Sequence, residues 1–344
     1  MRVLRLLQCL VVLSALAGCG APAMTPPAAP ASSAAATAGA TVAVAAPARL
    51  PLTISYSALV ASQSPLWIAQ EAGLFERYGL DATLAYISSA QQTVAAQLSG
   101  EVDVSLNGGT GGVEPNLNGA DIAIFTGTKN QLAGRIMARP DITSIEDLRG
   151  KSVGMTRRGG NSHYMGIVAL ARFGLDPERD VIFVGAGGSP ETVAALSAGS
   201  IDAAAMISPA DYEAERRGFK TLLDVTPLAI PYPALQSTAR RAVLAAKEEA
   251  AWRYTQALAD AVEVYKTDRE RALRVIGEYS KVEDRAALES AYETERAIMA
   301  SDLRPSLEAV QAVMNEVANT DPRVLDTRPE DYVDFRFVDR LAAR

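Results

Sequence analysis

The stretch Arg77-Tyr78-Gly79-Leu80-Asp81 recurs in this chain as Arg172-Phe173-Gly174-Leu175-Asp176. A second echo follows in the same order: Thr93-Val94-Ala95-Ala96 with Gly100 and Asp103, then Thr192-Val193-Ala194-Ala195 with Gly199 and Asp202. The offset grows from 95 to 99 residues, which an insertion of four residues around 185–189 explains. Two echoes in one order and at similar spacing predict that a single structural unit is present twice.

Each copy alternates between strand and helix patterns. Strands are expected at 52–57, 82–87 and 102–106 in the first copy, and at 152–155, 181–184 and 202–207 in the second. Helices are expected at 65–77, 90–99, 162–173 and 190–198, and Gly79 and Gly174 stand where a helix ends in a left-handed residue. Such alternation implies parallel sheets, whose ligands bind beyond the carboxyl ends of the strands. The predicted fold class is therefore α/β, with two lobes facing a ligand cleft.

The chain must cross between the two lobes and return. The apolar strand expected at 122–128 runs into Gly127-Thr128-Lys129-Asn130, and the return carries Pro227, Pro231 and Pro233. Hinges are a few loop or strand-end residues that absorb backbone rotation, so we expect them near 128–140 and 225–236. Lobe 1 should then comprise 51–128 and 237–344, and lobe 2 should comprise 129–236.

The C-terminal segment is charged and predicted to be helical. It carries two apolar stripes at helical spacing: Tyr254, Leu258, Val262 and Tyr265 form one, and Leu307, Val310, Met314 and Val317 form the other. We expect both helices to pack onto lobe 1.

The N-terminus has the features of a secretory signal. Arg2 and Arg5 precede an apolar run that is too short to span a bilayer, so 1–18 is interpreted as a signal peptide. Leu16-Ala17-Gly18-Cys19 resembles the lipobox of bacterial lipoproteins, which implies cleavage before Cys19 and lipidation of its sulfur. Acyl chains hold a protein at a membrane by about 0.8 kcal/mol per buried CH₂. The alternative is an ordinary signal peptide that is cut elsewhere.

The segment after Cys19 is interpreted as a linker. From 20 to 48 there is no charged residue, and Ala, Pro, Thr and Ser dominate, so the segment lacks the large apolar side chains that offset the entropy of ordering. We expect 19–50 to be a flexible tether that places the folded part outside the cytoplasm, at the membrane surface.

Composition excludes several kinds of chemistry. The chain has two cysteines, Cys9 in the signal peptide and Cys19, and a single histidine, His163, so a cysteine-based metal cluster or a multi-histidine metal site is impossible. Without Arg2 and Arg5 the chain carries 31 basic and 40 acidic residues, a formal charge of −9, which argues against nucleic-acid binding. No catalytic residue, metal or cofactor is expected.

Three stretches resemble the nitrate, sulfonate and taurine substrate-binding proteins of ABC importers, a group that includes binders of thiamine-pyrimidine precursors. They are the stretches from Ser64 to Leu80, from Leu98 to Asp103 and from Ile145 to Gly154. The resemblance is good over 52–219 and weak in the C-terminal helices. It implies a periplasmic-binding-protein fold of the second type and a monomer that traps a small solute by hinge closure. It also implies ABC permease and ATPase subunits as partners.

Strand ends nominate the ligand-binding residues of lobe 1. The strand expected at 102–106 runs into the glycine-rich stretch 107–112, where Asn107, Gly108 and Thr110 can offer side-chain and backbone hydrogen bonds. A flexible glycine loop without a ligand is the alternative. Gln63 and Ser64 follow the first strand, and Thr128 lies at the crossing.

Lobe 2 offers a glycine-rich turn before a helix, which is a natural anion site. Its candidates are Arg158, Gly160, Asn161, Ser162 and His163. Arg158 could bind a carboxylate or sulfonate in bidentate fashion, or it could simply be solvated, and His163 is ranked lower, as a packing residue. After the last strand come Ser208 and Asp211, of which Asp211 is better explained as a helix cap than as a ligand contact.

The leading hypothesis is therefore an extracytoplasmic receptor for a small, anionic solute: a sulfonate, a nitrate-like or taurine-like ion, or a carboxylate. The alternative is an enzyme of the same fold, because pyrimidine-precursor synthases and menaquinone-pathway enzymes resemble it. The cysteine-rich motif of the former cannot be present here, because the mature chain retains only Cys19.

Overall fold

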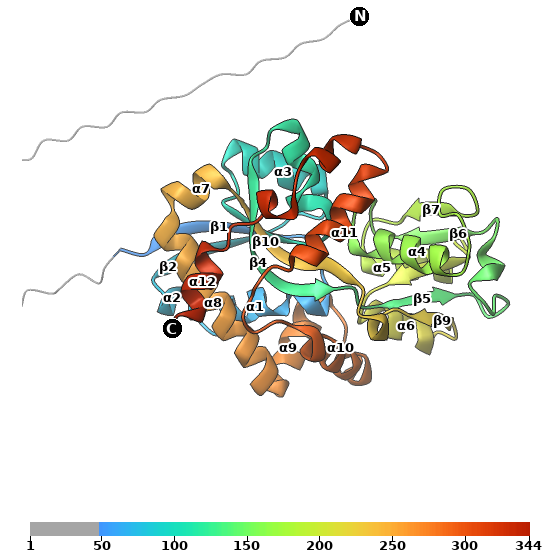
Figure 1. Cartoon of the computed structure of the whole chain (residues 1–344). Coiled ribbons are helices and arrows are strands. Elements are labelled where there is room, and N and C mark those ends of the chain that lie inside the picture. Colours follow the sequence, from blue (N-terminus) through green and yellow to red (C-terminus); the bar gives the residue numbers. More distant parts are fainter. Residues whose placement is uncertain (1–47) are drawn as a thin grey trace, which may run out of the picture. The chain divides into compact units, whose positions relative to one another are not determined.

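Residues 48–344, the part of the chain that the computed structural model describes, form two five-stranded sheets with helices around them (Figure 1). The expected signal peptide, the lipidation site Cys19 and nearly all of the expected linker lie outside the described residues.

The first sheet has the strand order β2-β1-β3-β10-β4. Its strands are β1 (Leu50–Tyr56), β2 (Leu80–Tyr86), β3 (Val104–Asn107), β4 (Ile122–Gln131) and β10 (Pro231–Arg240). Strand β1 pairs in parallel with β2 and β3, whereas β10 is antiparallel to β3 and β4. We call this sheet and the helices packed on it lobe 1.

The second sheet, the centre of lobe 2, repeats this topology with the order β7-β6-β8-β5-β9. Its strands are β5 (Arg135–Ala138), β6 (Ser152–Met155), β7 (Ile182–Gly185), β8 (Ala203–Met206) and β9 (Lys220–Asp224). Strand β6 is parallel to β7 and β8, and β5 is antiparallel to β8 and β9. The predicted α/β class, with one unit present twice, is confirmed.

The helices lie close to their expected positions. Lobe 1 begins with α1 (Ser64–Glu71), α2 (Leu74–Arg77) and α3 (Ala90–Ser99), and lobe 2 has α4 (Asn161–Arg172), α5 (Ser189–Ser197) and α6 (Ala210–Arg216). The C-terminal helices are α7 (Arg241–Ala246), α8 (Glu248–Thr267), α9 (Arg269–Ser280), α10 (Arg285–Ile298), α11 (Leu307–Ala318) and α12 (Arg336–Ala342). The helix expected at 65–77 is divided, because Gly73 adopts a left-handed φ of 65° that interrupts it.

The repeated aspartates explain the second echo in the sequence. Asp103 accepts a hydrogen bond from the backbone N–H of Thr53 at 3.0 Å, and Asp202 accepts one from the N–H of Ser152 at 2.8 Å. In each lobe the aspartate stands directly before the third strand of the unit, and its carboxylate bonds to the first strand. The repeated aspartate therefore has the same structural role in both sheets.

The chain crosses between the sheets after Gln131 and returns before Pro231. Strands β4 and β10 stay paired up to the register Gln131–Pro231, so the crossings are the short segments 132–134 and 225–230. These segments fall inside the ranges expected for the hinges. By sheet membership, 129–131 and 231–236 belong to lobe 1, because the ladder holds them there.

The two apolar stripes of the C-terminal segment pack in different places. The stripe on α8, which includes Tyr254 and Leu258, lies in the core of lobe 1 as expected. Helix α11 packs on β10 of lobe 1, as expected. Its stripe, which includes Val310 and Met314, joins a core cluster that also contains Ile136 of lobe 2, because the segment before α11 bonds to β4 and leads the helix to the junction of the lobes.

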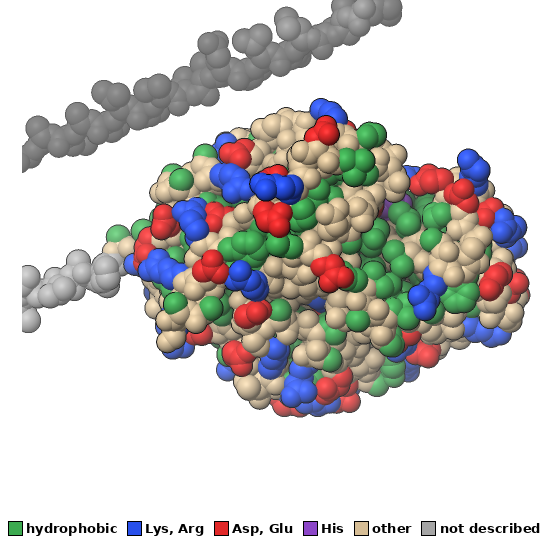
Figure 2. All heavy atoms as spheres, viewed as in Figure 1, with side chains coloured by type: hydrophobic (Ala, Val, Ile, Leu, Met, Phe, Trp, Pro, Cys, Tyr) green, Lys and Arg blue, Asp and Glu red, His purple; other side chains and the backbone are tan. Residues whose placement is uncertain are grey.

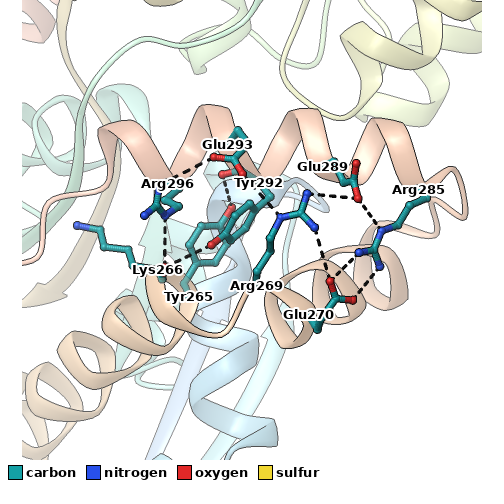
Figure 3. Close-up of polar contacts among 9 residues, drawn as sticks. All are labelled: Tyr265, Lys266, Arg269, Glu270, Arg285, Glu289, Tyr292, Glu293 and Arg296. Carbon is teal, nitrogen blue, oxygen red and sulfur yellow. Dashed lines mark hydrogen bonds and ion pairs between the residues drawn. The ribbon is translucent and has the colours of Figure 1, made fainter.

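A fully buried ion pair holds α10 against β4. The Lys129 ammonium lies 2.9 and 3.0 Å from the two carboxylate oxygens of Glu295, and the side chains are 1% and 0% exposed. On the outer side of α10, Arg269 and Arg285 join Glu289 in a surface network of ion pairs (Figure 3).

Within residues 48–344, no helix has the length and apolar character needed to cross a membrane.

We predict that Glu295→Gln destabilises the protein by about 3–5 kcal/mol, because it leaves the Lys129 charge buried without its carboxylate. The matched control is Glu289→Gln on the exposed face of the same helix, where solvent screens the lost pair and little change is expected. Urea unfolding of both variants measures the difference. Equal midpoints for the two variants would contradict the prediction.

Candidate functional site

A cavity of about 160 Å³ lies between the two lobes. From lobe 1 it is lined by Ser57, Ala58, Leu59, Val60, Ser62, Gln63, Tyr86, Ser88, Gly108 and Ala234. From lobe 2 it is lined by Thr156, Arg157, Gly160, Asn161, Ser162, Gly187, Gly188, Ser189, Pro190, Glu191 and Ile207. Most of these residues follow the carboxyl ends of β1, β2, β3, β6, β7 and β8, which is where an α/β sheet binds its ligands.

Two helix N-termini reach the cavity without a side-chain cap. Gly160 precedes α4 and Gly188 precedes α5, and neither can offer a side-chain acceptor to the first backbone N–H groups. In lobe 1 the counterpart of α5 is α3, where the Ser89 hydroxyl accepts from the N–H of Gln92 and so caps the helix, whereas α1, the counterpart of α4, also begins without a side-chain cap. The two lobe 2 termini therefore present N–H groups and partial positive charge to whatever occupies the cavity.

Arg157 is the cationic side chain of the cavity lining. Its Nη1 donates to the backbone carbonyl of Ser88 in lobe 1 at 2.8 Å, so the side chain reaches across the cleft. Among residues 48–344, no carboxylate lies within 4.0 Å of its guanidinium. Burial lowers the pKa of Arg157 from its ordinary value, and an anion bound beside it would relieve that cost.

Two amide side chains of the lining keep an unpaired oxygen. Gln63 is 3% exposed, and its Oε1 has no hydrogen-bond partner within the described residues. Asn161 donates through Nδ2 to the carbonyl of Ala234 at 2.7 Å, whereas its Oδ1 is equally without a partner there. A buried polar atom without a partner costs about 1–3 kcal/mol, so these amides are available to a polar ligand.

The two glycine-rich loops touch each other across the cleft. The N–H of Thr110 donates to the carbonyl of Gly159 at 3.3 Å. A Cβ atom on Gly109 would lie 2.3 Å from that same carbonyl, and one on Gly108 would lie 2.6 Å from Oδ1 of Asn161 in lobe 2. Glycine is therefore required at both positions for the lobes to approach this closely.

Five of the residues nominated from the sequence line the cavity: Gln63, Gly108, Gly160, Asn161 and Ser162. The other eight do not: Ser64, Asn107, Thr110, Thr128, Arg158, His163, Ser208 and Asp211. Several of the eight are instead engaged in hydrogen bonds within the protein.

In lobe 1 the nominated residues outside the lining hold local structure. The Ser64 hydroxyl donates to the carbonyl of Ala61 at 2.6 Å, and Asn107 donates to Thr238 on the neighbouring strand at 3.1 Å. The Thr110 hydroxyl donates to Glu114 at 2.9 Å. Thr128 is buried within β4 rather than placed in a loop.

In lobe 2 the arginine nominated from the sequence is replaced in the lining by its neighbour. The Arg158 side chain is 65% exposed and lies 3.8 Å from Glu178, whereas Arg157 faces the cavity. The sequence shows two adjacent arginines, and the turn of the backbone decides which one points inward.

The side chains of His163 and Asp211 form hydrogen bonds to other residues of lobe 2. The Nδ1 of buried His163 accepts from the N–H of Gly159 at 3.2 Å, which agrees with its interpretation as a packing residue. Asp211 accepts from the hydroxyl of Ser208 and from the N–H of Tyr212, both at 2.8 Å, inside the first turn of α6. Burial raises the pKa of the Asp211 carboxyl.

Several lining residues were not nominated from the sequence, above all Arg157, Tyr86, Ser88 and the stretch 187–191. The insertion of four residues expected around 185–189 does not account for the last one, and that expectation is wrong. The loops between β2 and α3 (87–89) and between β7 and α5 (186–188) are equally long, so the four extra residues of the second copy lie earlier, between Gly174 and Gly185. In the described part of the chain, no group of three His, Cys, Asp or Glu side chains is placed to hold a metal ion.

Comparison with known proteins identifies the family. The family model described as the NMT1-like family matches residues 45–276. The chain belongs to the NMT1-like family.

Two solved structures show the fold. The alkanesulfonate-binding protein SsuA from Xanthomonas axonopodis pv. citri, bound to MOPS, is similar with a TM-score of 0.70 at 19% identity, over 84% of this chain and 100% of that one. The nitrate-binding protein NrtA from Synechocystis PCC 6803 has a TM-score of 0.71 at 15% identity, over 86% and 88%. The predicted periplasmic-binding-protein fold is thereby confirmed.

A curated relative, the binding protein YtlA of Bacillus subtilis (strain 168), is 28% identical over 122 residues. The alignment covers 34% of this chain and 36% of that protein, so the chain matches about a third of the relative's length.

Proposed function

We propose that this protein is the solute-binding component of an ABC importer and captures a small monoanion between its lobes. The observation that carries the proposal is Arg157, which lies in the cavity without a carboxylate beside it and next to two uncapped helix N-termini. A guanidinium and free backbone N–H groups together bind sulfonate, nitrate or carboxylate oxygens well.

Charge complementarity supports an anion as the ligand. The chain as a whole is acidic, with a formal charge of −7, and its surface mixes both signs of charge (Figure 2). The cavity differs from this average, because its charged lining residues are Arg157 and the exposed Glu191. One partly buried positive charge favours one negative charge on the solute.

The ligands of two structural relatives also support an anion as the solute. SsuA is an alkanesulfonate-binding protein and NrtA is a nitrate-binding protein, and both ligands are monoanions. The identities are low, so we carry over only the ligand class. The residues of this cavity decide whether the protein binds a sulfonate, a nitrate-like ion or a carboxylate.

Capture proceeds by closure of the lobes about the crossings at 132–134 and 225–230. In the structure the lobes are in contact through Arg157 and Ser88, Thr110 and Gly159, and Asn161 and Ala234. A solute bound between the helix N-termini and Gln63 would add its own hydrogen bonds to these contacts and so favour the closed arrangement.

The remaining elements of the proposal follow from the importer role. The mature protein would work outside the cytoplasm as a monomer, tethered by a lipid on Cys19, and would deliver its solute to permease and ATPase subunits. We propose binding without chemical conversion, because the lining combines one guanidinium with amide and hydroxyl side chains that can hydrogen-bond a solute. An enzyme of this fold is the alternative, and solute recovered unchanged after incubation argues against it.

We predict that Arg157→Ala weakens the binding of methanesulfonate by about tenfold or more, because a hydrogen bond to a charged group contributes about 1.5–3 kcal/mol. Arg158→Ala is the matched control, since the neighbouring arginine is exposed and lies outside the lining. Isothermal titration calorimetry measures both variants. The anion assignment fails if Arg158→Ala is the more damaging variant or if wild type binds no sulfonate, nitrate or carboxylate.

Closure generates a second prediction. Saturating methanesulfonate should lower the radius of gyration of wild type in solution scattering, and Gly109→Ala should prevent the full decrease because its methyl group meets Gly159. Gly119→Ala is the control: Gly119 has the same φ of 81° but open space around it, so it shares the backbone strain of about 1–2 kcal/mol without the clash. A wild-type profile that ligand leaves unchanged would contradict closure.

A further inference from the structure

One side of the cavity is aromatic and apolar rather than polar. Tyr86 is 46% exposed and belongs to a set of large hydrophobic side chains that are exposed within residues 48–344; the others are Leu98, Phe173, Ile182 and Leu325. Of this set, Tyr86 lines the cavity and the other four do not. A large ring left half-exposed inside a binding cavity is a surface for a ligand to cover.

A row of packed aromatic side chains supports the Tyr86 ring. Tyr86 pairs with Tyr56 in the register of β2 and β1, and the two rings lie 5.5 Å apart at 36°. Tyr56 in turn packs edge-on against Trp67 at 5.8 Å, and Trp67 stacks on Tyr279 at 4.6 Å. Tyr86 is therefore the end of an aromatic row, and it requires no rearrangement to receive a ligand.

The ring stands beside the anion-binding group. Ser88, two residues beyond Tyr86, is the residue whose carbonyl accepts from Arg157 at 2.8 Å. A ligand whose charged group meets Arg157 thus extends its body along Tyr86. Leu59 and Pro190 add apolar surface to the same cavity from the two lobes.

The size of the cavity limits that body. A volume of about 160 Å³ is close to that of the roughly 150 Å³ apolar cavity known to hold one benzene molecule. A single ring with its charged group would fill the space, whereas a bare inorganic anion would leave the Tyr86 side empty. An ammonium group on the ligand finds only Glu191, which is exposed and hydrated.

We infer that the solute is a monoanion with a single aromatic ring, an arenesulfonate or an aromatic carboxylate. The charged group binds Arg157 and the helix N-termini, and the ring packs on Tyr86. This inference rests on the proposed function, because it needs an anion at Arg157, and it adds the class of organic body that the cavity selects.

Calorimetry with three sulfonates tests the selection. Benzenesulfonate should bind at least about tenfold more tightly than methanesulfonate, since it buries a ring as well as the charged group. It should also exceed cyclohexanesulfonate, which has similar bulk but no π face, because ring stacking adds about 0.5–1.5 kcal/mol, roughly threefold to tenfold in affinity.

Variants separate the ring from the anion site. Tyr86→Ala should cost about tenfold for benzenesulfonate and leave methanesulfonate within about twofold, whereas Tyr86→Phe should retain both affinities. Phe173→Ala is the matched control, because Phe173 is a 38% exposed ring outside the cavity, and it should change neither affinity.

The outcomes distinguish this inference from the proposed function. If benzenesulfonate binds no more tightly than methanesulfonate or taurine, or if Tyr86→Ala weakens all sulfonates equally, the aromatic selection is overturned while the anion-binding function stands. If no sulfonate, nitrate or carboxylate binds at all, the proposed function fails and this inference fails with it.

Discussion

The antiparallel pairing of β4 with β10 is the constraint on which the rest of the structure depends. Both strands run for ten residues and remain paired up to Gln131 and Pro231, so the two crossings leave lobe 1 side by side. The same ladder brings Ala234 to Asn161 at the start of α4, and Lys129 to Glu295 on α10. Because hydrogen bonds fix the ladder, only the short segments beyond it are available for rotation.

The repeated unit explains why several helix N-termini gather at the cavity. Each copy brings three parallel strands to one edge, tied together by Asp103 in one lobe and Asp202 in the other. The helices that follow these strands begin at that edge, so their N-termini converge there. In lobe 1, Ser89 caps α3, whereas Gly160 and Gly188 leave α4 and α5 uncapped. Between α3 and its counterpart α5, glycine stands where a hydroxyl caps the helix in lobe 1, and the first N–H groups of α5 are left without a side-chain acceptor.

Two glycines in the loop after β3 allow the close approach of the lobes. Gly108 and Gly109 have no side chain where Oδ1 of Asn161 and the carbonyl of Gly159 approach from lobe 2. Arg157 reaches Ser88 across the same cleft. Burial of the guanidinium lowers its pKa, which is the electrostatic cost that an anion would offset. Under the proposed function, a negatively charged ligand offsets this cost and its body lies along Tyr86.

The sequence by itself determined the α/β class, the repeated topology and most element boundaries, because these follow from local periodicity and from glycines such as Gly79 and Gly174. It also located the glycine-rich turn before α4. Only the tertiary structure decided that Arg157 rather than Arg158 faces the cavity, that α11 packs at the junction of the lobes, and that Tyr86 lines the site. Each of these depends on contacts between segments far apart in the chain, and local patterns carry no information about which side of a turn or helix such a partner will cover.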